Sequence, residues 1–144
     1  MSCNVYFFNQ SEWFIVSMSQ TTFGVWVANG RVVRLPQDAS DETLGKGVLD
    51  LLASSQTGVA HPTDGKAFRQ QYKDSLGVKN VNKFERGSLL LAVQQAGDSF
   101  TITPYRTEKQ GHMELPDKLG LDAPDPAQLG AGIRECLGRC EMAV

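Results

Sequence analysis

The two histidines, His61 and His112, are the side chains of this sequence best suited to acid–base catalysis near neutral pH. Asp64 follows His61 closely, so these two could form a hydrolase triad with a serine, and Glu114 follows His112, around which a small hydrolase could also be built. No zinc-protease helix motif, P-loop or G-x-S-x-G pattern occurs in the sequence. Both histidines lie in polar, loop-like segments, where a solvent-exposed histidine is the commoner explanation. We therefore expect no catalytic residues and no enzyme.

Two further patterns could indicate a metal or a cofactor. Cys136 and Cys140 lie four residues apart on a predicted helix and could form half of a metal site, but no second pair of ligands is evident. The third cysteine, Cys3, makes the number odd, which favours buried free thiols in a reducing compartment. A repeated Leu-Gly-x-Gly resembles part of a dinucleotide fingerprint, but it lacks the third glycine and falls inside a helix. We expect no metal and no cofactor.

Acidic side chains form two groups in a chain whose net charge is −2. Each group precedes or begins a predicted helix, where capping, the helix dipole and solubility explain part of the charge. The two helices are equivalent in the sequence, so the groups are expected at the same end of the fold. There they would form a surface complementary to a basic partner. The candidate partner-binding residues are Asp38, Asp41, Glu42, Glu114, Asp117 and Asp122.

The middle of the chain has the opposite charge. Residues 61–110 contain eight basic and five acidic side chains. Within residues 66–86, Tyr72 and Phe84 are interleaved with the basic residues, a pattern that would suit a nucleic-acid-binding accessory domain. The alternative is a solvated helix face, which the acidic character of the whole chain favours. In that interpretation the protein makes no direct contact with nucleic acid.

The charged side chains must be positioned by regular elements, and two stretches of the sequence that align without a gap indicate such elements. They are residues 40–52 and 125–137. Their apolar residues coincide with the i, i+4, i+7, i+8 stripe of an amphipathic helix. Ser40 and Asp125 are good N-caps, and Gln128 completes a capping box with Asp125. A glycine inside a helix costs about 1 kcal/mol relative to alanine, so the paired glycines indicate that each helix packs closely on a sheet.

Strand-like runs precede each of these helices. Asn29-Gly30 predicts a two-residue hairpin between strands at 25–28 and 31–35, and a turn at Gly97-Asp98 joins strands at 89–93 and 100–103. A third helix is expected at 66–76 with Gly77 as its C-cap, and residues 55–65 and 104–117 are expected to be loops.

The predicted fold class is α+β. The domain is expected to consist of two similar halves, each a meander followed by a helix. The helices pack either on one face of an antiparallel sheet or around a sheet that both halves share. Residues 1–144 are expected to form a single domain. The sequence has no recognisable secretion signal and no apolar run of membrane-spanning length, which predicts a soluble cytoplasmic protein without membrane contact.

The second half of the chain, about residues 81–140, resembles the CdiI-type immunity proteins of bacterial contact-dependent growth inhibition systems, and the first half echoes it more weakly. The residues that carry the resemblance are Val81-Asn82-Lys83-Phe84, the strand at 88–93, Phe100-Thr101-Ile102-Thr103-Pro104, the loop with Gly111, Leu115-Pro116, and Leu129-Gly130-x-Gly132-Ile133 leading to Cys140.

The resemblance implies a cytoplasmic protein that binds and neutralises, one to one, the C-terminal toxin domain of a large cell-surface CdiA-type effector delivered by a neighbouring cell. Such toxins are often nucleases, frequently acting on tRNA. The family supplies no catalytic set that could be transferred to this sequence.

Overall fold

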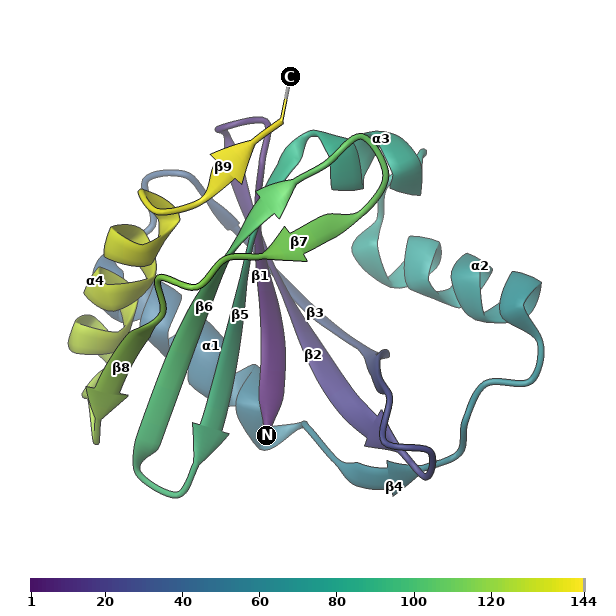
Figure 1. Ribbon diagram of the computed structural model, residues 1–144, viewed down its shortest axis with the longest axis horizontal. Helices are drawn as coiled ribbons and strands as arrows, with labels where there is room; N and C mark the ends of the chain where they lie inside the picture. The colour runs from purple at the N-terminus through teal and green to yellow at the C-terminus, as the bar shows by residue number, and fades with distance from the viewer. Residues whose placement is uncertain (144) are drawn as a thin grey trace.

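The computed structural model describes residues 1–143 and shows a central sheet with helices on both faces (Figure 1). Within these residues no helix is long and apolar enough to cross a membrane. The elements in chain order are β1 (Ser2–Phe8), β2 (Glu12–Thr21), β3 (Trp26–Pro36), α1 (Asp41–Ala53), β4 (Thr57–Val59), α2 (Gly65–Leu76), α3 (Val81–Arg86), β5 (Ser88–Ala96), β6 (Ser99–Thr107), β7 (His112–Glu114), β8 (Leu119–Asp122), α4 (Pro126–Leu137) and β9 (Glu141–Met142).

The main path of the sheet has the order β3-β2-β1-β5-β6-β7, and each neighbouring pair on it is antiparallel. Strands β8 and β9 also pair with β6, and the short β4 pairs with β2. The first meander is therefore β1-β2-β3 followed by α1, and the second is β5-β6-β8 followed by α4. Antiparallel pairing of β1 with β5 joins the two meanders into one sheet. The predicted α+β architecture of two similar meander-plus-helix halves is confirmed.

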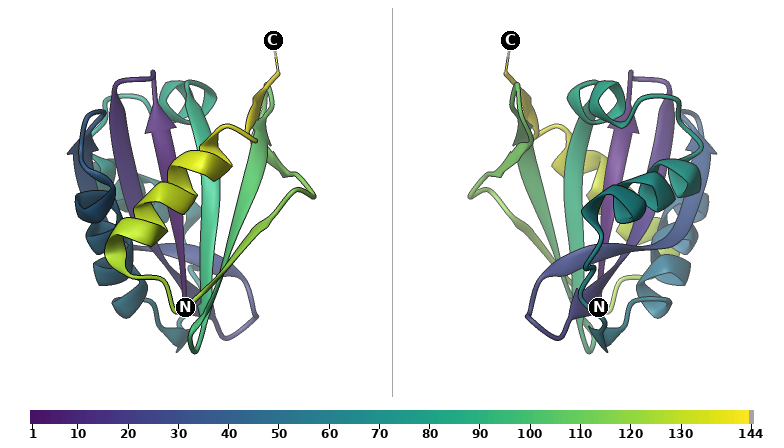
Figure 2. Two further views of the ribbon diagram at one scale, coloured as in Figure 1. Left: turned by 90° about the vertical axis from the view of Figure 1, so that its left-hand side faces the viewer. Right: turned by 90° about the vertical axis from the view of Figure 1, so that its right-hand side faces the viewer.

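Successive side chains of a strand point to opposite faces of the sheet, so the hydrophobic core is divided into two parts, one on each face. Cys3 and Val5 of β1 point toward α1 and α4, whereas Tyr6 points toward α2 and α3. Phe84 of α3 fills the second face and packs on the Tyr6 ring with centroids 5.1 Å apart. Figure 2 shows the resulting three layers, with α1 and α4 on one side of the sheet and α2 and α3 on the other.

The repeated helices contact each other through the first glycine of each Leu-Gly-x-Gly motif. Gly45 of α1 lies against the backbone carbonyl of Pro126, and Gly130 of α4 lies against the backbone carbonyl of Asp41. A Cβ at either glycine would overlap that carbonyl oxygen. The contact is reciprocal, because each helix presents its glycine to the first residue of the other.

The second glycine of each motif faces the sheet. A Cβ on Gly47 would lie 2.9 Å from Ile15 Cδ1, and one on Gly132 would lie 2.9 Å from Leu121 Cδ1. The prediction that the glycines permit close packing on a sheet is therefore confirmed for Gly47 and Gly132. The first glycine of each pair serves the contact between helices instead.

The predicted hairpin at Asn29-Gly30 is wrong, because residues 26–36 form one continuous strand, β3. Both predicted arms pair with β2 and not with each other: Ala28 lies opposite Met18, and Val32 lies opposite Val16. The register shift between these pairs places residues 29–31 at a bulge, where Gly30 has φ +90°. A positive-φ glycine after asparagine is common to a tight turn and a bulge, so the dipeptide alone does not distinguish them.

Other boundaries differ less. The turn at Gly97-Asp98 is confirmed, with Ala96 paired to Ser99. Helix α2 ends at Gly77 in the left-handed conformation, as predicted, and the capping box of α4 is present. The expected loop at 104–117 is partly wrong, because β6 extends to Thr107 and β7 follows it. The expected loop at 55–65 includes the short strand β4.

Candidate functional site

The two histidines do not assemble with the carboxylates next to them in the sequence. His61 Nδ1 lies 3.2 Å from Thr21 Oγ1, whereas Asp64 accepts a hydrogen bond from Ala67 N as the N-cap of α2. His112 Nε2 lies 3.2 Å from the backbone oxygen of Ser88. Both histidines are half-buried and have a structural partner, so the expectation that they are solvent-exposed is wrong. The expected loop placement is confirmed for His61, whereas His112 begins β7.

The cysteines are packing residues. Cys136 Sγ donates to the backbone oxygen of Ile102 at 3.7 Å, and Cys140 Sγ donates to that of Leu90 at 3.4 Å. Burial raises the pKa of the Cys136 thiol to about 11, which keeps it protonated and unreactive at neutral pH. Across residues 1–143, no three His, Cys, Asp or Glu side chains are arranged to hold a metal ion.

The six acidic candidates do not form a single patch. Asp41 and Glu42 begin α1, and Asp38 precedes them. This end of α1 lies beside the second half of α4, where Arg134 donates a hydrogen bond to the Ala39 carbonyl. Asp122 ends β8, just before α4 begins, whereas Glu114 ends β7. The acidic groups therefore flank both ends of α4 and not one end of the fold.

Four of the six carboxylates are paired with basic side chains of the same chain. The partners are Arg134 for Asp41 at 2.7 Å, Lys46 for Glu42 at 3.0 Å, Lys118 for Glu114 at 2.9 Å and Arg139 for Asp117 at 3.5 Å. In the part of the chain that the structure describes, Asp38 and Asp122 are exposed and make no ion pair. Asp122 also lines a shallow cleft of about 490 Å³ between β8 and α4, together with Glu135 and apolar residues.

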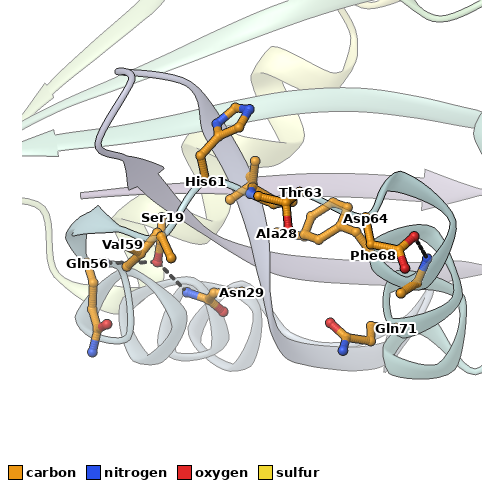
Figure 3. Close-up of a pocket in the computed structure, with 14 residues that line it drawn as sticks. Ser19, Ala28, Asn29, Gln56, Val59, His61, Thr63, Asp64, Phe68 and Gln71 are labelled. Atoms are coloured by element: carbon orange, nitrogen blue, oxygen red, sulfur yellow. Dashed lines mark hydrogen bonds between the residues drawn. The ribbon is translucent and has the colours of Figure 1, made fainter.

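A larger cleft, of about 530 Å³, lies between the β2–β3 region and the start of α2. Phe68 of α2 and Ala28 of β3 line its apolar part, while Asn29 and Gln71 add amide groups (Figure 3). The Asn29 amide is fixed at the bulge of β3, because its Nδ2 donates to Ser17 Oγ, Ser19 Oγ and the Ser54 carbonyl at 2.9, 3.0 and 3.2 Å. The bulge thus supplies a rigid polar wall to this cleft.

An exposed aromatic residue adjoins this cleft. Phe23, in the β2–β3 turn, is 75% exposed, and its ring forms a T-shaped pair with the His61 ring, with centroids 4.9 Å apart. His61 itself lines the cleft. An apolar ring this exposed next to a concave surface is typical of a protein-binding site. Sequence reasoning missed Phe23; its signal was a phenylalanine in a polar turn, between Thr22 and Gly24.

The family model for the CDI immunity protein CdiI matches residues 2–140, which is nearly the whole chain. The chain belongs to the CdiI family. It is thus an immunity protein by family, and the resemblance seen in the sequence is confirmed over a longer stretch than residues 81–140. No curated protein matches this CdiI protein.

Two solved structures share the fold of this CdiI protein. A protein of unknown function from Neisseria meningitidis, NMB0488, superposes with a TM-score of 0.82 at 24% identity, over 97% of this chain and 94% of that one. The CdiA-CT/CdiI toxin and immunity complex from Yersinia pseudotuberculosis contains a chain with a TM-score of 0.78 at 19% identity, over 97% of both chains. At these identities the likeness shows a common fold, while the surfaces can differ.

Proposed function

We propose that this CdiI protein binds the C-terminal toxin domain of a CdiA-type protein, one to one, and neutralises it in the cytoplasm without catalysing a reaction. The family match over residues 2–140 carries the proposal. The fold shared with a chain of the Yersinia pseudotuberculosis toxin and immunity complex supports it. We also propose that residues 1–144 act as one domain.

Co-expression with the C-terminal region of the CdiA-type protein from the same organism tests this proposal. A complex of 1:1 mass by light scattering, together with growth arrest when the CdiI chain is omitted, is the expected result. Growth arrest that this chain does not relieve, with no complex on a tag pull-down, would contradict it.

We propose further that the toxin is a nuclease that acts on tRNA. The physical support is electrostatic: a nuclease needs a basic surface for its polyanionic substrate, and an acidic inhibitor surface complements it. RNA extracted from cells that express the toxin alone is expected to show cleaved tRNA, and co-expression of this chain should abolish the cleavage. Intact RNA and DNA during growth arrest would refute the nuclease assignment.

For the toxin interface we propose the acidic candidates Asp38, Asp41, Glu42, Glu114, Asp117 and Asp122. Asp122 is the best placed for a direct contact, because its carboxylate is unpaired within residues 1–143 and lines a cleft with an apolar floor. Such a cleft suits a lysine or arginine side chain, whose aliphatic stem and charged end need both kinds of surface. The paired carboxylates contribute mainly through the field that steers association.

Reversing the charge of Asp117 and Asp122 to lysine is expected to lower the association rate about 10-fold at low salt, with a smaller change at high salt. A matched control reverses Asp50 and Asp74, which changes the net charge equally outside the acidic candidates. Stopped-flow or surface plasmon resonance measures both variants. Equal association rates for the two variants would refute this location of the interface.

The cleft beside Phe23 is a second contact surface that a specific observation favours. An aromatic ring that is 75% exposed has little structural use, and its burial by a partner would contribute about 1.5–3 kcal/mol to binding. Phe23→Ala is expected to weaken toxin binding at least 10-fold, mainly through faster dissociation. The control Met142→Ala removes another exposed apolar side chain, on β9, a strand that carries none of the acidic candidates, and should leave affinity unchanged. Equal affinities of the two variants would exclude the cleft.

A further inference from the structure

The basic middle of the chain forms a concave surface at the junction of α2 and α3. A hollow of about 330 Å³ there has no carboxylate among its lining residues. Its cations come from the exposed face of α2 and from the α2–α3 connection. They are Lys66, Arg69, Lys73 and Lys79.

A second hollow, of about 350 Å³, adjoins the first, since Arg69 and Asn82 line both. It adds Arg86 of α3 and Lys109 of the β6–β7 loop, with Glu85 as its one acidic lining residue. The two hollows together concentrate a net charge of +5 in a chain whose net charge is −2. Lys109 lies outside residues 66–86, so the sequence did not reveal this convergence.

The Arg69 guanidinium is held in place between the hollows. Its Nη2 donates to Asn82 Oδ1 at 2.5 Å, and its Nη1 lies 3.9 Å from Glu85 Oε1. Within residues 1–143, the three lysines of the first hollow make no ion pair. Lysines around one concavity repel each other, and an anion bound among them would relieve that repulsion.

The spacing suits a chain of anions better than a single ion. Lys66, Arg69 and Lys73 follow one face of α2, with steps along the helix axis of roughly 4.5 and 6 Å. The aromatic residues nearby are not available for stacking on bases, because Phe84 is buried in the core and Tyr72 packs toward Tyr6. The surface can therefore contact a sugar-phosphate backbone but has no means to read bases.

We propose that the α2–α3 hollows bind the phosphates of a nucleic-acid backbone, without sequence preference. The site lies on the face of the sheet opposite α1 and α4, and its lining residues on α2 differ from those of the cleft beside Phe23. Affinity is modest and depends steeply on salt, because binding rests on the release of counterions.

The test is fluorescence anisotropy of a labelled mixed-sequence 20-nucleotide RNA with the full chain at 50 and 200 mM salt. With the six cations of the two hollows engaged, the dissociation constant should rise about 300-fold between these concentrations. The variant Lys66→Gln/Lys73→Gln/Lys79→Gln should bind more weakly and show only about a 20-fold rise. The control Arg31→Gln/Lys46→Gln/Lys118→Gln has the same net charge and should behave as the unmodified chain.

If the triple variant does not fold, the exposed pair Lys66→Gln/Lys79→Gln should give a rise of about 50-fold. No binding at 50 mM salt would overturn the proposal, as would equal losses in the hollow and control variants. Tighter binding of a polyglutamate peptide of equal charge, sensitive to the same lysines, would also overturn it and indicate an acidic protein segment as the ligand.

Discussion

Replacing Gly45 with alanine tests the reciprocal contact between α1 and α4. A Cβ there would lie 2.6 Å from the carbonyl carbon of Pro126, whereas carbon atoms in contact are normally about 3.5 Å apart. The neighbour is backbone, so no side-chain rotation can relieve the overlap, and because the carbonyl oxygen is nearer than the carbon the helices must separate by more than about 1 Å. Overpacking of this kind costs about 1–3 kcal/mol, and the better helix propensity of alanine returns up to about 1 kcal/mol. We expect a net loss of about 1–2 kcal/mol.

Urea denaturation followed by circular dichroism measures this loss. Gly65→Ala is the matched control, because it replaces a helical glycine with open space around it and no left-handed φ, and should be neutral or slightly stabilising. Gly47→Ala should cost less than Gly45→Ala, because its close neighbour is the end of the Ile15 side chain, which can move. A Gly45→Ala variant as stable as Gly65→Ala would refute the reasoning.

The pseudo-symmetry makes a sharper prediction for the double variant. Gly130 meets the Asp41 backbone at the same helix–helix contact, so the separation forced by Gly45→Ala also makes room at Gly130. The two substitutions should therefore be less than additive, by about 0.5–1.5 kcal/mol in a double-mutant cycle. Strict additivity would mean that each glycine is accommodated locally and that the helices do not move as a pair.

Three further predictions concern other parts of the molecule. Asn29→Ala removes the amide that fixes the β3 bulge and should cost about 1–3 kcal/mol in urea denaturation, whereas Arg31→Ala, at the exposed side of the bulge, should cost little. Asp125→Ala removes the capping box of α4 and should lower the free energy of unfolding by about 1 kcal/mol, while Asp122→Ala should not, which a thermal melt of both would show. Burial raises the pKa of the Cys136 thiol from about 9 to about 11, so its contribution to stability is complete below pH 9 and is lost as pH rises to about 11. Cys136→Ala should therefore reduce the fall of the denaturation midpoint over that range without removing it, because burial also raises the pKa values of the Cys3 and Cys140 thiols.

The parts of the fold that the sequence predicted are those fixed by local chemistry. The caps and apolar stripes of α1, α2 and α4 are all present where the sequence placed them. The duplicated Leu-Gly-x-Gly motif also predicted two similar halves, because a glycine inside a helix is costly unless something packs against it. The motif could not reveal which element packs against each glycine, because close contact with a sheet and close contact with a helix both require a residue without a side chain.

The wrong or missing predictions concern segments whose contacts in the fold are with residues distant in the sequence. Strand β1 was not predicted, although it joins the two halves through its pairing with β5, because both its faces are buried and its sequence lacks a clean alternation. The Asn29-Gly30 bulge depends on β2 and on α1's C-cap residue, Ser54, which a two-residue pattern does not contain. The acidic candidates failed to converge for the same reason, since β8 separates Asp117, which lies beside Arg139 after α4, from Asp122, which ends β8 shortly before α4 begins.

The sequence described the distribution of charge only in part, because it separated a basic middle from the acidic groups but did not show that they lie on opposite faces of the sheet. The hollows at α2 and α3 hold a net +5, so the remainder of the chain carries about −7, much of it beside α1 and α4. The central sheet separates these two surfaces (Figure 2). At a Debye length of about 8 Å in physiological salt, each face attracts its own ligand with little influence from the other. A chain with a mildly acidic isoelectric point can therefore present an acidic surface to a basic protein and a basic surface to a polyanion at the same time.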